Sequence, residues 1–118
     1  MNQLALVLNM AAALCERGIC PEHLFRVEHA QKGLVGCQPY SLRVGHWVIN
    51  GDAYRTICDA LLIHDEQLRT ATELDIREAS AHVNEQAAIG NVIRFEETGH
   101  QVKTHRAARE AGSSATKF

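Results

Sequence analysis

The chain has 118 residues, of which 46% are hydrophobic, 22% charged and 5% aromatic, and its formal net charge is -2. This length suits a single domain with its own core, and the low aromatic content disfavours a β-sandwich or barrel. The slight excess of acids excludes the globally basic surface that is typical of nucleic-acid-binding domains. We therefore expect a mainly α protein, a compact helical domain of about five short helices.

The first segment predicts an amphipathic helix over residues 3–17. Gly18 follows the last apolar residue and is suited to end the helix at its C′ position. The apolar residues recur at helical spacing, and they are Leu4, Val7, Leu8, Ala11, Leu14 and Cys15. No basic segment precedes this run, and it is too short to span a bilayer. We expect a cytoplasmic protein of bacterial or phage type that has no membrane partner.

A second helix is predicted to begin at Pro21, because proline is tolerated in the first turn, and to run to about Ala30. The next stretch, residues 33–51, is interrupted by four glycines. Residues 41–50 fit either a helical turn or two or an extended strand with Trp47 packed inward. The pattern leaves both structures open.

Two further helices are predicted by their capping residues and by the spacing of their apolar residues. Asn50 is a candidate N-cap for the first, whose predicted apolar face consists of Tyr54, Ile57, Cys58, Leu61 and Leu62. Thr72 and Asp75 have the spacing of a capping box for the second, which should continue through Ile76, Ala79 and Val83 and stop at Gly90. The domain is therefore expected to span residues 1–90.

The remaining chain divides into two parts. Residues 91–106 alternate weakly around Thr98-Gly99 and are expected to form a β-hairpin or a dimer contact. Residues 107–118 are small and polar, as expected of a mobile tail. Positive charge is dense near the end, at Lys103, Arg106, Arg109 and Lys117, where a basic arm could contact phosphates.

Two segments resemble the helix-turn-helix DNA-binding domain of the lambda repressor and Cro type. The first is GICPEHLFRVEHAQKG, residues 18–33, which looks like that family's turn and recognition helix. The second is AYRTICDALLIHDEQL, residues 53–68, which looks like its fourth helix and the turn that follows. Together they cover about a quarter of the chain, and the helix-turn-helix-like region extends over about residues 3–68. The resemblance implies a small DNA-linked transcription regulator that binds duplex DNA as a homodimer, because one recognition helix reads one half-site.

The resemblance can be aligned in two registers. In the first, residues 21–32 form the recognition helix, which implies that Arg26, Gln31 and Lys32 contact DNA. In the second, CQPYSLRV is the recognition helix, and Gln38, Tyr40, Ser41 and Arg43 face the groove. The first is the closer local match, whereas the second accounts for more of the chain. Glutamine and arginine are the side chains that read adenine and guanine edges.

Charge weakens the DNA hypothesis, because residues 1–68 contain more acids than bases. The bases would have to gather on one face to bind a phosphate backbone. The alternative is a protein–protein interaction module, an inhibitor or adaptor that docks on a larger machine without binding DNA. Near-neutral charge and compact helices favour it almost equally.

Two chemical alternatives stay open. Thiols and imidazoles gather as they would around a structural zinc, at Cys15, Cys20, His23, His29 and Cys37, but no CxxC or HxxxH pair is present. Cys37 or Cys58 could also pair with a histidine in a small enzyme, yet HExxH and GxSxG are missing. We expect a binding protein rather than an enzyme, with no catalytic residue, metal or cofactor.

Overall fold

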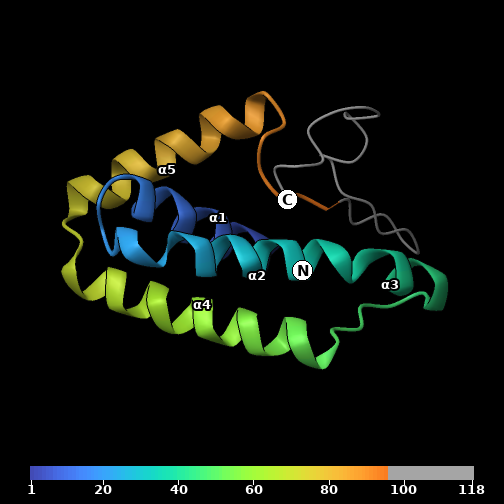
Figure 1. Cartoon of the computed structure of the whole chain (residues 1–118). Coiled ribbons are helices and arrows are strands. Elements are labelled where there is room, and N and C mark those ends of the chain that lie inside the picture. The colour runs from blue at the N-terminus through green and yellow to red at the C-terminus, as the bar shows by residue number, and fades with distance from the viewer. Residues whose placement is uncertain (96–118) are drawn as a thin grey trace.

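A computed structural model describes residues 1–95 of the chain (Figure 1). These residues form five α-helices and one 3₁₀ turn, which are α1 (Asn2–Glu16), η1 (Pro21–His23), α2 (Leu24–Gly36), α3 (Gln38–Val44), α4 (Gly51–Thr70) and α5 (Glu73–Ala88). The mainly α prediction is confirmed. Within the described part of the chain, none of the helices combines the length and apolarity needed to cross a membrane.

The core lies where α1, α2 and α4 meet, and α5 packs on α1 (Figure 1). Its central side chains come from all three helices, as Leu8, Leu34 and Ile57 illustrate. A second cluster joins α1 to α5 through Leu14 and Val83. Amphipathic helices of this length gain most of their stability from such packing.

Helix α1 ends as its sequence predicts. Gly18 has φ +100°, which is a left-handed conformation that glycine adopts without steric cost. The amide of Gly18 donates to the Cys15 carbonyl, and that of Ile19 donates to the Leu14 carbonyl. These bonds satisfy carbonyls at the helix end and turn the chain toward Pro21.

The predicted end of the second helix is wrong. Instead of stopping near Ala30, α2 continues through Gly33 to Gly36. A Cβ at Gly33 would lie 3.3 Å from both the Ala53 Cβ and the Thr56 Oγ1, so this glycine permits close contact with α4 rather than breaking the helix. Tertiary packing therefore outweighs the low helix propensity of glycine here.

The open question about residues 41–50 is resolved. Helix α3 includes Ser41 and ends at Val44, and Gly45 (φ +83°) forms its left-handed cap. The chain then passes back over this helix, and the Val48 amide donates a hydrogen bond to Ser41 Oγ at 3.0 Å. Residues 45–50 form no strand. Trp47 is half-buried and meets the Phe95 ring edge-on, with centroids 4.8 Å apart.

Both caps of the later helices are confirmed. The Asn50 side chain accepts a hydrogen bond from the Ala53 amide at 2.8 Å, and Thr72 and Asp75 form a reciprocal capping box. Gly90 follows α5 with φ +76°. These local signals position both helix starts because they satisfy backbone amides that have no partner inside the helix.

The apolar face predicted for α4 is only partly right. Ile57 is buried, but Tyr54, Leu61 and Leu62 are exposed, and Cys58 is half-buried. The buried face instead combines two alanines and two isoleucines with one glutamine, namely Ala53, Ile57, Ala60, Ile63 and Gln67. Small side chains let α4 approach its neighbours closely, whereas the bulkier row points outward.

Residues 91–95 fold back along α1. Asn9 Nδ2 donates to the Ile93 carbonyl at 3.0 Å, and Asn2 Oδ1 accepts from the Phe95 amide at 2.7 Å. Val92, Ile93 and Phe95 are buried as a result. This part of the expected hairpin or dimer contact therefore belongs to the protein's own core. The rest of that segment, 96–106, and the expected tail, 107–118, lie outside the described residues.

Candidate functional site

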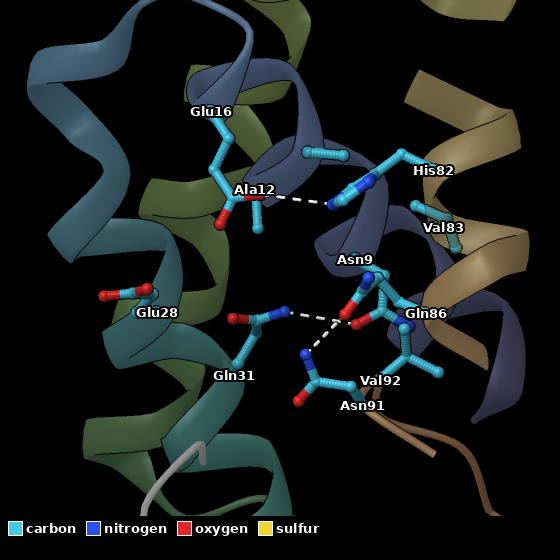
Figure 2. A pocket seen from close by; sticks show the side chains of 11 residues that line it. Asn9, Ala12, Glu16, Glu28, Gln31, His82, Val83, Gln86, Asn91 and Val92 are labelled. Carbon is cyan, nitrogen blue, oxygen red and sulfur yellow. Dashed lines mark hydrogen bonds and ion pairs between the residues drawn. The ribbon is translucent and has the colours of Figure 1, made fainter. Parts of the chain in front are cut away.

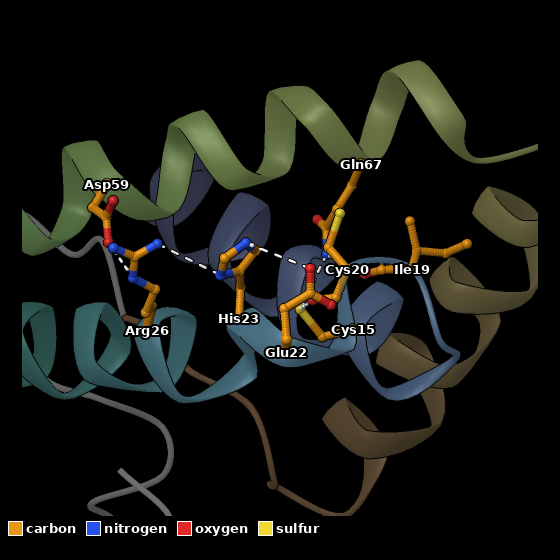
Figure 3. A network of polar contacts seen from close by, with 8 residues as sticks. All are labelled: Cys15, Ile19, Cys20, Glu22, His23, Arg26, Asp59 and Gln67. Atoms are coloured by element: carbon orange, nitrogen blue, oxygen red, sulfur yellow. Dashed lines mark hydrogen bonds and ion pairs between the residues drawn. The ribbon is translucent and has the colours of Figure 1, made fainter.

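The three DNA-contact candidates on α2 lie in different environments. Arg26 Nε is 3.3 Å from the Asp59 carboxylate on α4, so its charge is already paired (Figure 3). Gln31 is buried, and its Nε2 donates to Asn9 Oδ1 at 3.1 Å. Only Lys32 is exposed and makes no ion pair with any described residue. Gln31 is therefore a core residue, and its expected contact with DNA is incompatible with this fold.

The DNA-contact candidates on α3 also differ in how far they are buried. Gln38 is buried, which corrects the expectation that it faces a groove, while Tyr40 and Arg43 are exposed. The Arg43 guanidinium lies over the Tyr40 ring, 5.2 Å from its centroid. A single residue, Cys37, separates α2 from α3, whereas helix-turn-helix motifs use a turn of three or four residues. The second register requires a turn before CQPYSLRV, but the preceding segment AQKGLVG, residues 30–36, belongs to α2.

Most basic side chains of residues 1–95 are paired with carboxylates. The paired arginines are Arg17, Arg26, Arg55, Arg69 and Arg77. In the same range Lys32, Arg43 and Arg94 have no carboxylate partner. Because a carboxylate accompanies each of these arginines, the described residues present little net positive charge to a nucleic-acid backbone.

The cysteines and histidines do not converge. Within residues 1–95, no three His, Cys, Asp or Glu side chains are arranged to hold a metal ion, and all four cysteines are free thiols. Burial raises the pKa of Cys15 to about 11, which keeps this thiol protonated and chemically inert. In the same part of the chain, no hydrogen bond joins Cys37 or Cys58 to a histidine.

A small polar cavity lies between α1, α2 and α5 (Figure 2). Its volume is about 90 Å³, and Glu16 Oε1 lies 3.5 Å from His82 Nε2 at its wall. Asn9 and Gln31 bond to each other on its inner side. Such a volume holds about three water molecules, which is too little for an organic substrate.

A shallower groove of about 580 Å³ runs between the end of α2 and the start of α4. Its charged and polar lining includes His29, Lys32, Asp52 and Arg55. Asp52 pairs with Arg55, so Lys32 supplies the positive charge that is left there at neutral pH. The groove is open and nearly neutral.

The most distinctive surface is the side of α4 that faces away from α1 and α2, which we call the outer face. Four large side chains are exposed there, namely Tyr54 (63%), Leu61 (38%), Leu62 (70%) and Leu68 (47%). The neighbouring Cys58 thiol raises the pKa of Tyr54, as expected when the two side chains lie together one turn apart. In Figure 1, α4 forms one edge of the bundle.

No family model, curated protein or solved structure matches this chain.

The sequence pattern indicated three members of the outer face, Tyr54, Leu61 and Leu62, but assigned them to the core. It did not single out Leu68. The signal that could have identified this surface was the second apolar row of α4, because one face of a helix suffices for a core. The alanines at Ala53 and Ala60 mark the row that packs inward.

Proposed function

We propose that this protein is a small binding module that docks an α-helix of another protein chain on the outer face of α4. The observation that carries the proposal is the exposure of Tyr54, Leu61, Leu62 and Leu68 along one helix. Single exposed leucines are common, but contiguous apolar surface on a soluble domain marks an interaction site. A partner helix with apolar residues at matching spacing would cover it.

The properties of the remaining surface agree with this proposal. The described arginines are largely paired with carboxylates, and the cavity beside His82 is too small for a substrate. Four free thiols suit a reducing compartment, so we include a cytoplasmic location in the proposal. Binding through an apolar helix face needs neither a cofactor nor a catalytic group.

The test is site-specific photo-crosslinking in cells that express the full chain. A benzophenone amino acid at position 62 should give discrete adducts with another chain, and the same probe at position 74, a 55%-exposed leucine of α5, should not. After identification by mass spectrometry, the purified partner should rebind, and Leu62→Glu should weaken binding where Leu74→Glu does not. Absence of adducts at position 62, or equal adducts at both positions, would refute the proposal.

Duplex DNA is the second candidate partner, supported by Lys32 in the groove and by Arg43 beside Tyr40, both without carboxylate partners among residues 1–95. It ranks below protein docking because the other described arginines, Arg94 excepted, are paired. If DNA is bound, affinity should fall steeply with salt, and Arg43→Glu should weaken it. Failure to bind a duplex at low salt would remove this candidate.

A further inference from the structure

The polar cavity between α1, α2 and α5 has an acidic lining. Its ionisable side chains are Glu16 from α1, Glu28 from α2 and His82 from α5, and none of the described residues that line it is a lysine or an arginine. Glu16 and Glu28 are exposed at its mouth, whereas Gln31 is buried at its inner end (Figure 2). Two carboxylates outweigh one imidazole, so the cavity favours a positively charged occupant.

Gln31 provides an acceptor without a partner at the inner end of this cavity. The residue is 3% exposed, and its Nε2 donates to Asn9 Oδ1 at 3.1 Å. Its Oε1 accepts no hydrogen bond from any residue in 1–95. Buried amide oxygens nearly always have a donor, which can be a protein group, an ordered water or a ligand. Because Gln31 lines the cavity, an occupant of the cavity is placed to supply that donor.

The backbone of Ile93 fixes the orientation of the Gln31 amide. Asn9 Oδ1 accepts from the Ile93 amide at 3.3 Å, and Asn9 Nδ2 donates to the Ile93 carbonyl at 3.0 Å. An amide that meets Asn9 Oδ1 therefore has to present its NH₂ group, because two oxygens cannot share a hydrogen bond without a proton. Gln31 Oε1 consequently points away from Asn9, toward the side of Glu28 in Figure 2.

The two carboxylates of the lining also have unpaired oxygens. Glu28 lies three residues before Gln31 on the same side of α2, and it forms neither a hydrogen bond nor an ion pair with another described residue. Glu16 approaches His82 Nε2 through Oε1, which leaves its Oε2 without a partner among residues 1–95. The cavity thus combines three acceptors from two helices, and two of them are charged.

Three separated acceptors match the three N–H donors of a primary ammonium group. A metal ion suits the lining less well, because no three His, Cys, Asp or Glu side chains in residues 1–95 are arranged to hold one. The volume of about 90 Å³ equals that of about three water molecules, which accommodates an ammonium nitrogen and the first methylene groups of its stem. A guanidinium, with four heavy atoms in its planar head alone, is too large.

We infer that this cavity, which we call the ammonium pocket, binds a primary alkylammonium group through Glu16, Glu28 and Gln31 Oε1. The apolar part of its wall covers the methylene stem, and it consists of Ala12, Ala13, Val83 and Val92. A free amine and a lysine side chain both carry this group. The pocket lies on α1, α2 and α5, so the inference goes beyond the proposed function and does not depend on the outer face of α4.

A nuclear magnetic resonance titration of the ¹⁵N-labelled full chain tests the pocket. n-Butylammonium chloride at constant ionic strength should give saturable shifts that include the Gln31 side-chain amide, with a Kd of roughly 1–50 mM, as expected of a ligand with about five heavy atoms. Tetramethylammonium has the same charge but no N–H donor, and it should leave these signals unchanged. Equal shifts with both cations would overturn the inference.

Two charge-matched variants locate the binding site. Glu28→Gln keeps the shape of the side chain and should raise the Kd for n-butylammonium about 3-fold or more, the effect of losing an exposed charge partner. Glu85→Gln removes the same charge from an exposed residue of α5 outside the pocket and should leave the Kd unchanged. An equal rise in both variants would show only a general effect of net charge and would overturn the site.

Two further measurements distinguish the sources of the amine. Lysine with both backbone ends blocked should bind at least as tightly as n-butylammonium if the pocket receives a lysine side chain, and it should fail to bind if only a free amine fits. The chain's own Lys103 and Lys117 lie outside the described residues, and a Lys103→Gln, Lys117→Gln variant should bind the probe more tightly if either lysine occupies the pocket. Absence of saturable shifts in both the unmodified chain and this variant would overturn the inference and leave docking on α4 unaffected.

Discussion

Removal of the side chain of Gln67, which carries the single side-chain amide of α4, should strongly destabilise the fold. Gln67 is fully buried, and its Nε2 lies 3.0 Å from the Ala11 carbonyl, 3.1 Å from the Ile19 carbonyl and 3.2 Å from the Cys15 Sγ (Figure 3). Its Oε1 is 3.0 Å from His64 Nδ1. One amide therefore joins α4 to α1 and to the loop that follows α1.

The magnitude follows from these contacts. Each lost hydrogen bond that leaves a buried carbonyl unpaired costs about 1 kcal/mol or more, and the vacated space adds a cavity cost. We expect Gln67→Ala to lower the free energy of unfolding by about 3 kcal/mol, which corresponds to a fall in Tm of roughly 12 °C for a domain of this size. Gln67→Leu fills the space but loses the bonds, and should cost about 2 kcal/mol.

Urea unfolding followed by circular dichroism measures both variants, with Gln3→Ala on the exposed side of α1 as the control. Hydrogen exchange adds a local readout, because the amides of residues 18–20 should lose protection when the Ile19 carbonyl loses its partner. A cost below about 1 kcal/mol for Gln67→Ala, equal to that of the control, would show that this reasoning about the buried amide is incorrect.

Three further predictions concern stability. Burial raises the pKa of Cys15 from 9.0 to about 11, so the unfolded chain loses this proton first, and stability should fall between pH 9 and 11, by roughly 2–3 kcal/mol at most. Cys15→Ala should flatten that decline in urea titrations under reducing conditions. The capping bonds with Thr72 lower the pKa of Asp75, so its contribution is present above pH 3.8 and lost as pH falls through the lowered value; Asp75→Asn should flatten this acid limb. Gly33→Leu should cost about 1–3 kcal/mol by forcing α2 from α4, whereas Gly36→Ala, whose Cβ meets nothing within 4 Å, should be neutral or stabilising in thermal melts.

Local signals in the sequence predicted helix ends where one side chain or one glycine satisfies the backbone. Gly18 ends α1 through its positive φ, and Thr72 with Asp75 begins α5 through a capping box. The same reasoning was wrong at Gly33, which belongs to the interior of α2. A glycine that breaks a helix and a glycine that admits a neighbouring helix have the same appearance in the sequence, and the contact with Ala53 that distinguishes them lies 20 positions away.

The candidate DNA-contact residues illustrate a different limit. Residue type suggested Gln31 and Gln38 because glutamine can read a base edge, but burial depends on which side of each helix meets the core. Gln31 pairs with Asn9 of α1, and Asn9 also holds the Ile93 backbone at the other end of the described chain. Such long-range polar contacts leave no periodic signal in the sequence around either partner.

Helix α4 explains why the proposed interface was first interpreted as core. Its exposed row holds a tyrosine and leucines, whereas its buried row holds alanines and isoleucines, and the exposed row supplied most of the predicted apolar face. The bundle uses the row of Ala53 and Ala60, because small side chains allow close helix packing, and it leaves Tyr54, Leu61 and Leu62 in solvent. A helix that is apolar on both sides is expected to be buried on both sides. With a partner helix docked on the outer face as proposed, that expectation is met, since the protein's own core covers one row and the partner covers the other.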